Sequence, residues 1–288
     1  MATSAHDIGI RLSACAYPTV WRVVGGILVA VSRVSLPLIA IGVLTTNGPV
    51  PLIVLGRALA VCALLPAIAA WLIERACMVD VEVVAAELVL HGRGLRVDIP
   101  HTAIVGIRPW MVPLPGPGVA LRLRSGRRFS YGLQMTDPTQ LIAALADRGI
   151  VAAGEAIRHP VVVYAHAQSR MAAWRWYHPM AKFVLFALVP TAVWFNAHQH
   201  IAYGGLLGQY YLEGLGPYVT TFLVSWSLAA IYVLLYASVW RGVAETVALV
   251  AAWLAPAGAL TVRRGVEIAC RLAYYVGVPV LVLLPFLQ

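Results

Sequence analysis

Two histidines and a carboxylate form the pattern in this chain that is closest to a metal site. His198 and His200 lie near the end of an apolar run, and Glu213 follows in a loop rich in glycine and tyrosine. Imidazole nitrogens and a carboxylate oxygen can together hold a transition metal. Because residues i and i+2 of a helix point to different sides, one site requires that the helix has ended there. The alternative is a polar loop with an aromatic belt at a membrane interface.

Arginines inside apolar runs are a second group that could have a chemical role. Arg33 and Arg57 lie on neighbouring apolar runs whose interiors contain no carboxylate. A charge at the bilayer centre costs about 3 kcal/mol on insertion scales, so each arginine should face protein, water, a carboxylate or lipid phosphate. For Arg33, a second interpretation is a helix disturbed at Pro37, from which the guanidinium reaches the interface.

Acidic residues near the C-terminal apolar runs have arginines at helical spacing. Glu245 follows Arg241, and Glu267 precedes Arg271, each at a separation of four residues. This spacing predicts ion pairs on a helix surface. A proton relay through these intramembrane charges is the other interpretation.

Patterns for other chemistry are missing from the sequence. There is no G-x-S-x-G, Walker, Rossmann or HExxH motif. A haem held by two histidines needs them on facing helices, whereas His178 and His198 stand at opposite ends of one apolar run. The sequence therefore predicts no catalytic residue, cofactor or confident metal site. A haem or quinone near the loop that follows His200 would be expected only if the protein has a redox role.

Composition places the chain in a membrane. Hydrophobic residues make up 61% of its 288 positions and charged residues only 11%, against about 25% charged in ordinary soluble domains. The net charge of +9 comes mostly from arginines beside apolar runs, as the positive-inside rule and anionic headgroups favour. We expect a bilayer with anionic lipids as a partner, and no nucleic acid.

The apolar runs predict a polytopic α-helical protein with five spans. A sixth span is the alternative, because residues 243–260 are long enough to cross; their interruption by Glu245, Pro256 and Gly258 favours a re-entrant or interfacial segment. The charge asymmetry predicts a cytoplasmic N-terminus and an outer C-terminus. The expected spans are Val23–Leu44, Leu52–Ile73, Trp176–Asn196, Tyr218–Trp240 and Leu272–Leu287.

One long segment reads as a water-soluble insert between these runs. It contains short alternating strands joined by turns, followed by a helix with Asp137 as N-cap and Pro138 at its first position. Its charges nearly balance. The strands are expected at Val79–Val84, Leu88–His91, Leu95–Ile99, Ala103–Ile107, Val119–Arg124 and Arg127–Tyr131.

These segments resemble the bacterial PH-like domain of membrane proteins. The resemblance is carried by LVLHGRGLRVDIP, TAIVGI, VALRLRSGRRFSYGL and DPTQLIAAL. It implies a small β-barrel or sandwich with a C-terminal helix, on the cytoplasmic side of a bacterial inner membrane. We therefore expect a membrane hairpin over residues 1–75, a PH-like domain over 76–158, and a C-terminal membrane domain over 159–288.

A connector joins this domain to the third span. Its VVVY stretch, ending at Tyr164, predicts a further strand. Aromatic and basic residues then alternate in a way typical of a lipid interface: Arg170, Trp174, Arg175, Trp176 and Lys182.

Three functions fit these features. The first is a non-catalytic scaffold or accessory subunit that docks onto or regulates a larger membrane complex. The second is a transporter or channel-like subunit that uses a broken helix and its charges. The third is a membrane anchor of a redox complex.

Overall fold

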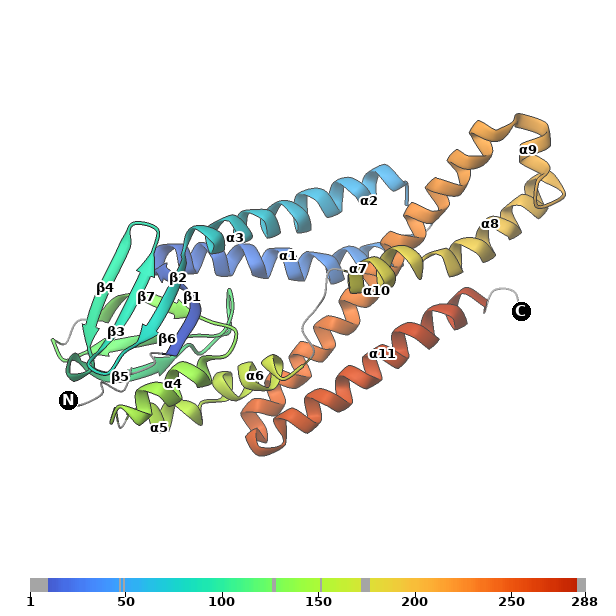
Figure 1. The fold of residues 1–288 in the computed structure, drawn as a ribbon. Helices are drawn as coiled ribbons and strands as arrows, with labels where there is room; N and C mark the ends of the chain where they lie inside the picture. The colour runs from blue at the N-terminus through green and yellow to red at the C-terminus, as the bar shows by residue number, and fades with distance from the viewer. Residues whose placement is uncertain are drawn as a thin grey trace, which may run out of the picture. The chain divides into compact units, whose positions relative to one another are not determined.

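The computed structural model describes residues 10–46, 48, 50–125, 128–150, 152–171 and 177–283. Within these residues, five helical segments are long and apolar enough to cross a membrane, and one antiparallel sheet has seven strands. Five is the number of spans that the sequence predicts. Figure 1 shows the strands with their covering helices and the long helices.

The first two apolar segments form a hairpin. Helix α1 spans Thr19–Thr45, and the return consists of α2 (Leu52–Leu59), a π-helical turn at Ala60–Leu64 and α3 (Leu65–Ala76). The Ser35 hydroxyl donates a hydrogen bond to the Cys62 carbonyl at 2.9 Å and thereby links the two arms. The π-turn leaves carbonyls without their usual helical partners, and Cys62 lies within that turn.

The remaining apolar segments are helices in the C-terminal half. The third segment combines α7 (Tyr177–Pro179), a π-helical turn (Met180–Leu185) and α8 (Leu188–Tyr203). A short helix α9 (Gly208–Glu213) leads to α10 (Leu215–Leu254), and after a turn at Pro256–Gly258 the chain returns as α11 (Ala259–Leu283).

The sheet has the strand order β4-β3-β2-β1-β7-β6-β5. Each neighbouring pair is antiparallel and, except for β1–β7, consecutive along the chain, and the chain passes from β4 at one edge of the sheet to β5 at the other. The strands are β1 (Ile10–Pro18), β2 (Met78–Val83), β3 (Glu87–Gly92), β4 (Leu95–Pro100), β5 (Ile104–Pro109), β6 (Gly118–Leu123) and β7 (Arg128–Gln134).

The N-terminal strand β1 was not foreseen from the sequence, which placed residues 1–75 in a membrane hairpin. It pairs with β2 on one side and with β7 on the other, and it continues directly into α1. Its alternate residues Ala14 and Ala16 face the sheet core, while Cys15 and Tyr17 are buried on the opposite face. The sheet domain therefore begins before the first span.

Three short helices cover the sheet core. Helix α4 (Pro138–Asp147) starts as predicted, with Asp137 as its N-cap. It is followed by α5 (Ala152–Ile157) and α6 (Pro160–Ser169). The apolar face of α4 inserts Leu141, Ile142 and Leu145 among the buried strand residues. Figure 1 shows the α4 ribbon beside the strands.

The prediction of a strand at VVVY is wrong, because these residues lie in α6. Pro160 occupies the first helical position, where a missing N–H costs nothing, and the His159 ring accepts a hydrogen bond from Val161 N at 3.3 Å. These local signals at the helix start outweigh the strand preference of three consecutive valines.

A re-entrant or interfacial position of residues 243–260 stays a prediction, but the structure shows where the helix is interrupted: at Pro256 and Gly258 and not at Glu245. Residues 243–254 continue α10 without a break, and Pro256 and Gly258 form the turn into α11. The 40-residue helix is about 60 Å long, twice the thickness of a bilayer core. Its C-terminal part is apolar because it packs on protein, as described below.

The chain divides into two compact units. One comprises Met1–Ser32, Leu64–Ala172 and Thr246–Arg263, and therefore contains the sheet, α4–α6 and the tip of the α10–α11 pair. The other comprises Arg33–Ala63, Ala173–Glu245 and Arg264–Gln288. The first unit combines parts of all three predicted segments.

The buried face of β1 gives a prediction about thiol reactivity. Burial, followed by the nearby charges of Glu74 and Cys77, raises the pKa of the Cys15 thiol to about 12. At pH 8 only about one Cys15 in 10,000 would then be a thiolate, the form that alkylating reagents attack. Iodoacetamide treatment followed by mass spectrometry should leave Cys15 unmodified in the folded protein and modify it in denaturant. Rapid modification of the folded protein would contradict the two-sided burial of β1.

Candidate functional site

Arg33 and Arg57 are exposed on the first two apolar segments. Arg33 lies near the middle of α1, and Arg57 lies in α2. Neither guanidinium has a hydrogen bond or ion pair with any residue in the described part of the chain. The α1 helix continues through Pro37. The structure thus leaves both charges facing outward from this helical pair.

The charges of α10 and α11 form the pairs that their spacing predicts. Arg241 binds Glu245 on α10, and Arg271 Nη2 lies 3.8 Å from Glu267 Oε2 on α11. Both are i,i+4 pairs along one helix, the interaction that typically contributes a few tenths of a kcal/mol at a surface. Cys270 Sγ donates to the Trp240 carbonyl at 3.5 Å, so the two ion pairs occupy adjacent stretches of neighbouring helices.

Lys182 belongs to the same end of these helices. Its ammonium lies 4.4 Å from the centroid of the Tyr274 ring and 5.3 Å from that of Phe183. The Tyr274 hydroxyl donates a hydrogen bond of 2.6 Å to the Lys182 carbonyl. The side chain is therefore half-buried against aromatic rings. Of the other predicted interface residues, Arg170 is exposed at the end of α6, and Trp174, Arg175 and Trp176 lie outside the described residues.

The predicted metal residues are held in separate interactions. The His200 ring is 2.9 Å from the Asn196 carbonyl, whereas the His198 ring packs against Tyr203. The Glu213 carboxylate accepts hydrogen bonds from the Tyr203 hydroxyl at 3.3 Å and from Gln209 Nε2 at 2.9 Å. Across the described residues, no group of three or more His, Cys, Asp or Glu side chains is placed to hold a metal ion.

A buried polar network that the sequence did not reveal lies beside these residues. Gln199 and Gln209 are buried and exchange two hydrogen bonds, from Gln199 Nε2 to Gln209 Oε1 and from Gln209 N to Gln199 Oε1. Gln209 also donates to Thr221 at 3.0 Å and so ties α9 to α10. Because these amides satisfy one another, they fix the loop between α8 and α10.

Asp137 is the centre of a second polar network, in the sheet domain. Its carboxylate accepts hydrogen bonds from Thr139 N, from Ser169 Oγ at 2.9 Å and from His166 Nδ1 at 3.2 Å. In a nucleophilic triad the imidazole stands between the hydroxyl and the carboxylate. Here the carboxylate stands between the other two, so this network joins the start of α4 to the end of α6. An open hollow of about 560 Å³ adjoins it, with Arg170 at its edge.

Two clusters of buried side chains in the described part of the chain join the sheet domain to the apolar helices, and the first lies around Trp110. The buried side chains of Cys15, Tyr17 and Trp110 pack with Ile73, near the end of α3, and with Cys77. The indole lies flat on β6 and β7, where a Cβ atom on Gly132 would come within 2.7 Å of it. Arg22 of α1 places its guanidinium 4.9 Å from the centroid of the Trp110 ring. We call this cluster the Trp110 joint.

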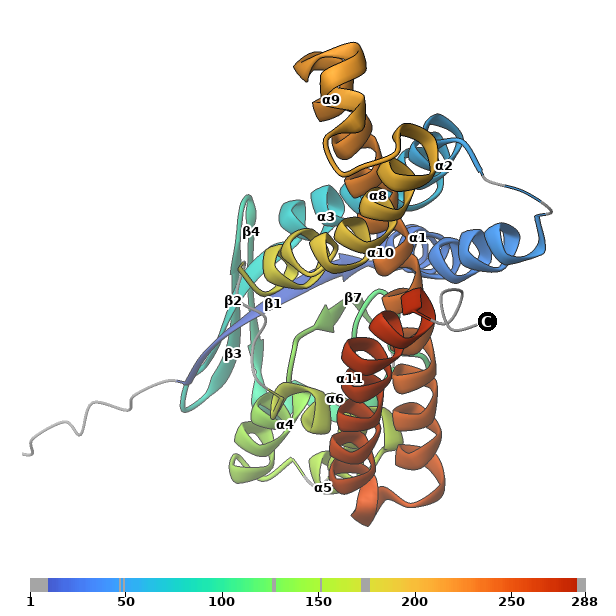
Figure 2. The ribbon, with the colours of Figure 1, turned by 90° about the vertical axis from the view of Figure 1, so that its right-hand side faces the viewer.

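The second contact is made by the tip of the α10–α11 pair. Tyr164 of α6 packs with Ala248, Ala252 and Ala259, with Val163 and Leu249 at the margin. The Arg263 guanidinium lies 5.3 Å from the centroid of the Tyr164 ring, and Trp253 meets His159 edge-on. Figure 2 shows α6 beside this tip. We call it the Tyr164 joint, and it explains why residues 243–260 are apolar.

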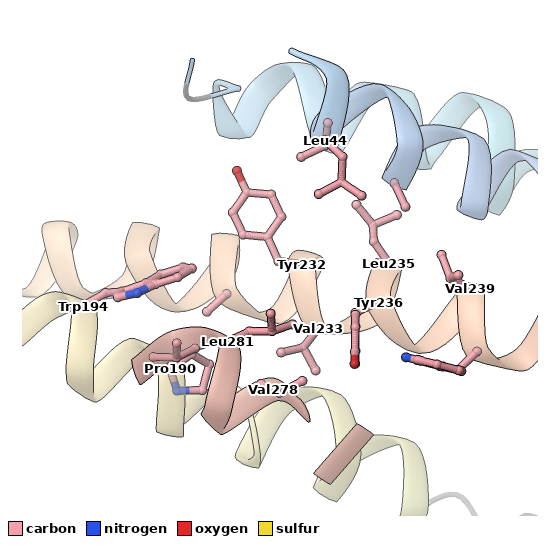
Figure 3. A pocket seen from close by; sticks show the side chains of 15 residues that line it. Leu44, Pro190, Trp194, Tyr232, Val233, Leu235, Tyr236, Val239, Val278 and Leu281 are labelled. Atoms are coloured by element: carbon pink, nitrogen blue, oxygen red, sulfur yellow. The ribbon is translucent and has the colours of Figure 1, made fainter. Parts of the chain in front are cut away.

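An apolar hollow of about 480 Å³ lies among the helices of the other unit. Figure 3 shows Leu44 of α1 on one side, with Tyr232 directed toward it from α10, and Pro190, Val278 and Leu281 on the other side. The hydroxyl of Tyr236 donates to the Ala273 carbonyl at 3.0 Å and is satisfied within the protein. The lining is suited to hydrocarbon and offers almost no hydrogen-bonding group.

The Asp137 network yields a prediction about stability. Burial raises the pKa of Asp137, but hydrogen bonds from Thr139, then from Ser169 and His166, outweigh it, so the pKa is lowered overall. Asp137→Ala should cost about 1–2 kcal/mol, the usual value of a helix N-cap. Thermal unfolding in detergent, followed by tryptophan fluorescence, should show a lower melting temperature for this variant but not for Gln140→Ala, an exposed position of α4.

The lowered pKa of Asp137 also predicts how the effect of Asp137→Ala on stability depends on pH. A carboxyl with a lowered folded-state pKa stabilises the protein fully above its unfolded value of about 3.9, and that contribution is lost as pH falls through the folded value. The difference in melting temperature between wild type and Asp137→Ala should therefore stay constant from pH 8 to about pH 5 and shrink below about pH 4. A difference that vanished already near pH 6 would contradict the lowered pKa of Asp137.

The described geometry thus supplies two outward-facing arginines on apolar helices, two joints between the sheet domain and the apolar helices, and two self-satisfied polar networks. The helix ion pairs were foreseen from the sequence, whereas the joints and the networks were not. No known protein family, curated protein or solved structure matches this chain.

Proposed function

We propose that this chain is a non-catalytic membrane scaffold or accessory subunit, which docks onto a larger membrane complex. The observation that carries the proposal is the outward exposure of Arg33 and Arg57, without hydrogen bonds or ion pairs to any described residue. An unpaired arginine in a bilayer is unfavourable by about 3 kcal/mol on insertion scales, so such residues generally face a partner. A second membrane subunit that carries a carboxylate at the matching depth would supply it.

The depth of Arg33 argues for a protein partner in preference to lipid phosphate. Arg33 lies 14 residues from Thr19 and 12 from Thr45, the two ends of α1. At about 1.5 Å per residue, these separations are roughly 21 and 18 Å. An arginine side chain reaches only about 6 Å, which falls short of the headgroups of a bilayer whose hydrocarbon core is about 30 Å thick. A carboxylate within the bilayer would lie closer to the Arg33 guanidinium than the lipid phosphates do.

The two joints support the scaffold part of the proposal. The Trp110 joint attaches the sheet domain to the α1–α3 hairpin, and the Tyr164 joint attaches it to the α10–α11 pair. Both joints lie within the compact unit that contains the sheet, so the helix ends that belong to this unit would present the sheet domain to a second partner. Seven antiparallel strands followed by a helix agree in outline with the PH-like domain that the sequence resembles.

The transporter hypothesis depended on a broken helix at residues 243–260. The structure has α10 continuous through Leu254 and a turn only at Pro256–Gly258, and Glu245 and Glu267 lie in ion pairs with Arg241 and Arg271. No described feature favours it over the subunit hypothesis. A redox anchor with haem or quinone stays a prediction of the sequence, and Soret absorbance of the purified protein would test its haem part.

The subunit hypothesis predicts recovery of a partner that depends on Arg33. Purification of the tagged chain in mild detergent should recover stoichiometric membrane proteins, at least one with an acidic residue inside a span. Arg33→Leu, which removes the charge, should lose that partner, with a smaller loss for Arg57→Leu near a helix end. Arg11→Leu is the matched control, because Arg11 is exposed on β1 and pairs only loosely with Glu82 at 3.4 Å. A monodisperse monomer with no partner would contradict the hypothesis.

Orientation in the membrane gives a separate prediction. Five spans with a cytoplasmic sheet domain place the C-terminus outside the cytoplasm. A periplasmically active reporter fused after Gln288 should be active, and the same reporter inserted in the turn at Gly94, between β3 and β4, should be inactive. Activity in the opposite pattern would refute the proposed orientation.

A further inference from the structure

The loop between β5 and β6 lies directly against the first apolar helix. A Cβ atom placed on Gly26 would be 3.7 Å from the Cβ of Leu114, and one placed on Gly25 would be 3.8 Å from the Cγ of Pro115. These are ordinary van der Waals separations, so the loop packs on a glycine surface in the second turn of α1. Such a close approach is possible because neither glycine has a side chain in the way.

The contact occurs just inside the apolar part of α1. Arg22 is the last charged residue before a run that stays uncharged until Arg33. Arg22 extends toward the sheet domain, over the Trp110 ring. Gly26 lies four residues further along, which is about 6 Å deeper at the rise of an α-helix. If Arg22 marks the headgroups, the loop lies level with the first carbons of the acyl chains.

The exposed side chains of the loop are apolar. Met111 is 65% exposed and Val112 is 58% exposed, and both follow the buried Trp110. Removing either side chain from water would contribute about 1.5–3 kcal/mol. Exposed apolar side chains are unfavourable in a loop that faces water, but next to the start of a membrane span they can face lipid.

The backbone of the loop is also suited to lipid. Pro113, Pro115 and Pro117 have no N–H group, and the Leu114 N–H donates to the Val112 carbonyl at 2.9 Å. An unsatisfied backbone N–H in hydrocarbon costs several kcal/mol, which normally keeps loops out of the bilayer. Three prolines and one internal hydrogen bond remove most of that cost here.

We propose that the β5–β6 loop, Met111–Pro117, inserts into the bilayer beside α1, with Met111 and Val112 among the upper acyl chains. The proposal rests on α1 crossing the membrane, as in the proposed function, but requires no partner protein. Insertion would fix the tilt of the sheet domain relative to the bilayer and bring the exposed Arg108 near the headgroups.

The test uses an environment-sensitive fluorophore attached to single cysteines in the full chain. Cys62, Cys77 and Cys270 are first replaced by Ala, and labelling is done at neutral pH, where burial raises the thiol pKa of Cys15 to about 12. Met111→Cys and Val112→Cys are the test positions. The proteins are reconstituted in vesicles of phosphatidylcholine and phosphatidylglycerol, with or without lipids brominated near the top of the acyl chain.

Two control positions give the signals expected in lipid and in water. Ile27→Cys, exposed on α1 next to Gly26, reports a site in the bilayer, and Thr102→Cys, exposed beyond the other end of β5, reports a site in water. The proposal predicts blue-shifted emission and strong bromine quenching at positions 111 and 112, as at position 27, with neither effect at 102. Quenching at 27 but not at 111 and 112 would overturn the loop insertion alone. No quenching at 27 would overturn the placement of α1 in the membrane, and the loop proposal with it.

Discussion

The pairing of β1 with β2 is the interaction on which the rest of the structure depends. β1 runs directly into α1, and β2 follows α3 after a single residue, so the two strands leave the same end of the helical hairpin. Cys15 lies opposite Met78, and Ala16 N donates to the Cys77 carbonyl at 2.9 Å. Closing the α1–α3 hairpin therefore brings the first two strands into register, and the remaining five can add to either edge.

The same strand explains the form of the domain core. β1 sits between β2 and β7, and its residues Ala14–Tyr17 are buried on both faces of the sheet. Ala14 and Ala16 are small enough for α4 to approach one face, and Tyr17 fills the other against Trp110. Replacing a buried aromatic by alanine commonly costs about 3–5 kcal/mol, so Tyr17 and Trp110 should be among the largest single contributors to the stability of the domain.

Periodicity and composition were sufficient to predict the five long apolar helices, the strands from β2 to β7 and the capped start of α4. They were insufficient for β1, because a two-sided buried strand with alanine, cysteine and serine gives neither a clean alternation nor a strongly apolar run. They also could not show that residues 243–254 pack on protein, because hydropathy cannot distinguish a lipid-facing helix from one that contacts α6.

The contacts of the candidate site also differ in whether the sequence could predict them. The ion pair of Arg241 with Glu245 depends only on helical spacing and was foreseen. The Asp137 network joins residues 29 and 32 positions apart, and the stacking of Trp110 on Gly132 depends on strand register. Nothing local in the sequence marks such contacts. Arg33 is a case between these two. Its depth along the helix could be read from the sequence, but the direction that its side chain faces depends on how the helices pack.

The central structural claim is that the sheet domain is fastened to the apolar helices at two joints. Hydrogen–deuterium exchange of the full chain in lipid nanodiscs, comparing wild type with Ala252→Arg, tests it most directly. Ala252 is 0% exposed in the Tyr164 joint, so a buried arginine there should separate the tip from α6. The account predicts faster exchange in α6 and in residues 246–263 together, with β1 and β2 unchanged. Faster exchange confined to residues 246–263, with α6 fully protected, would contradict it.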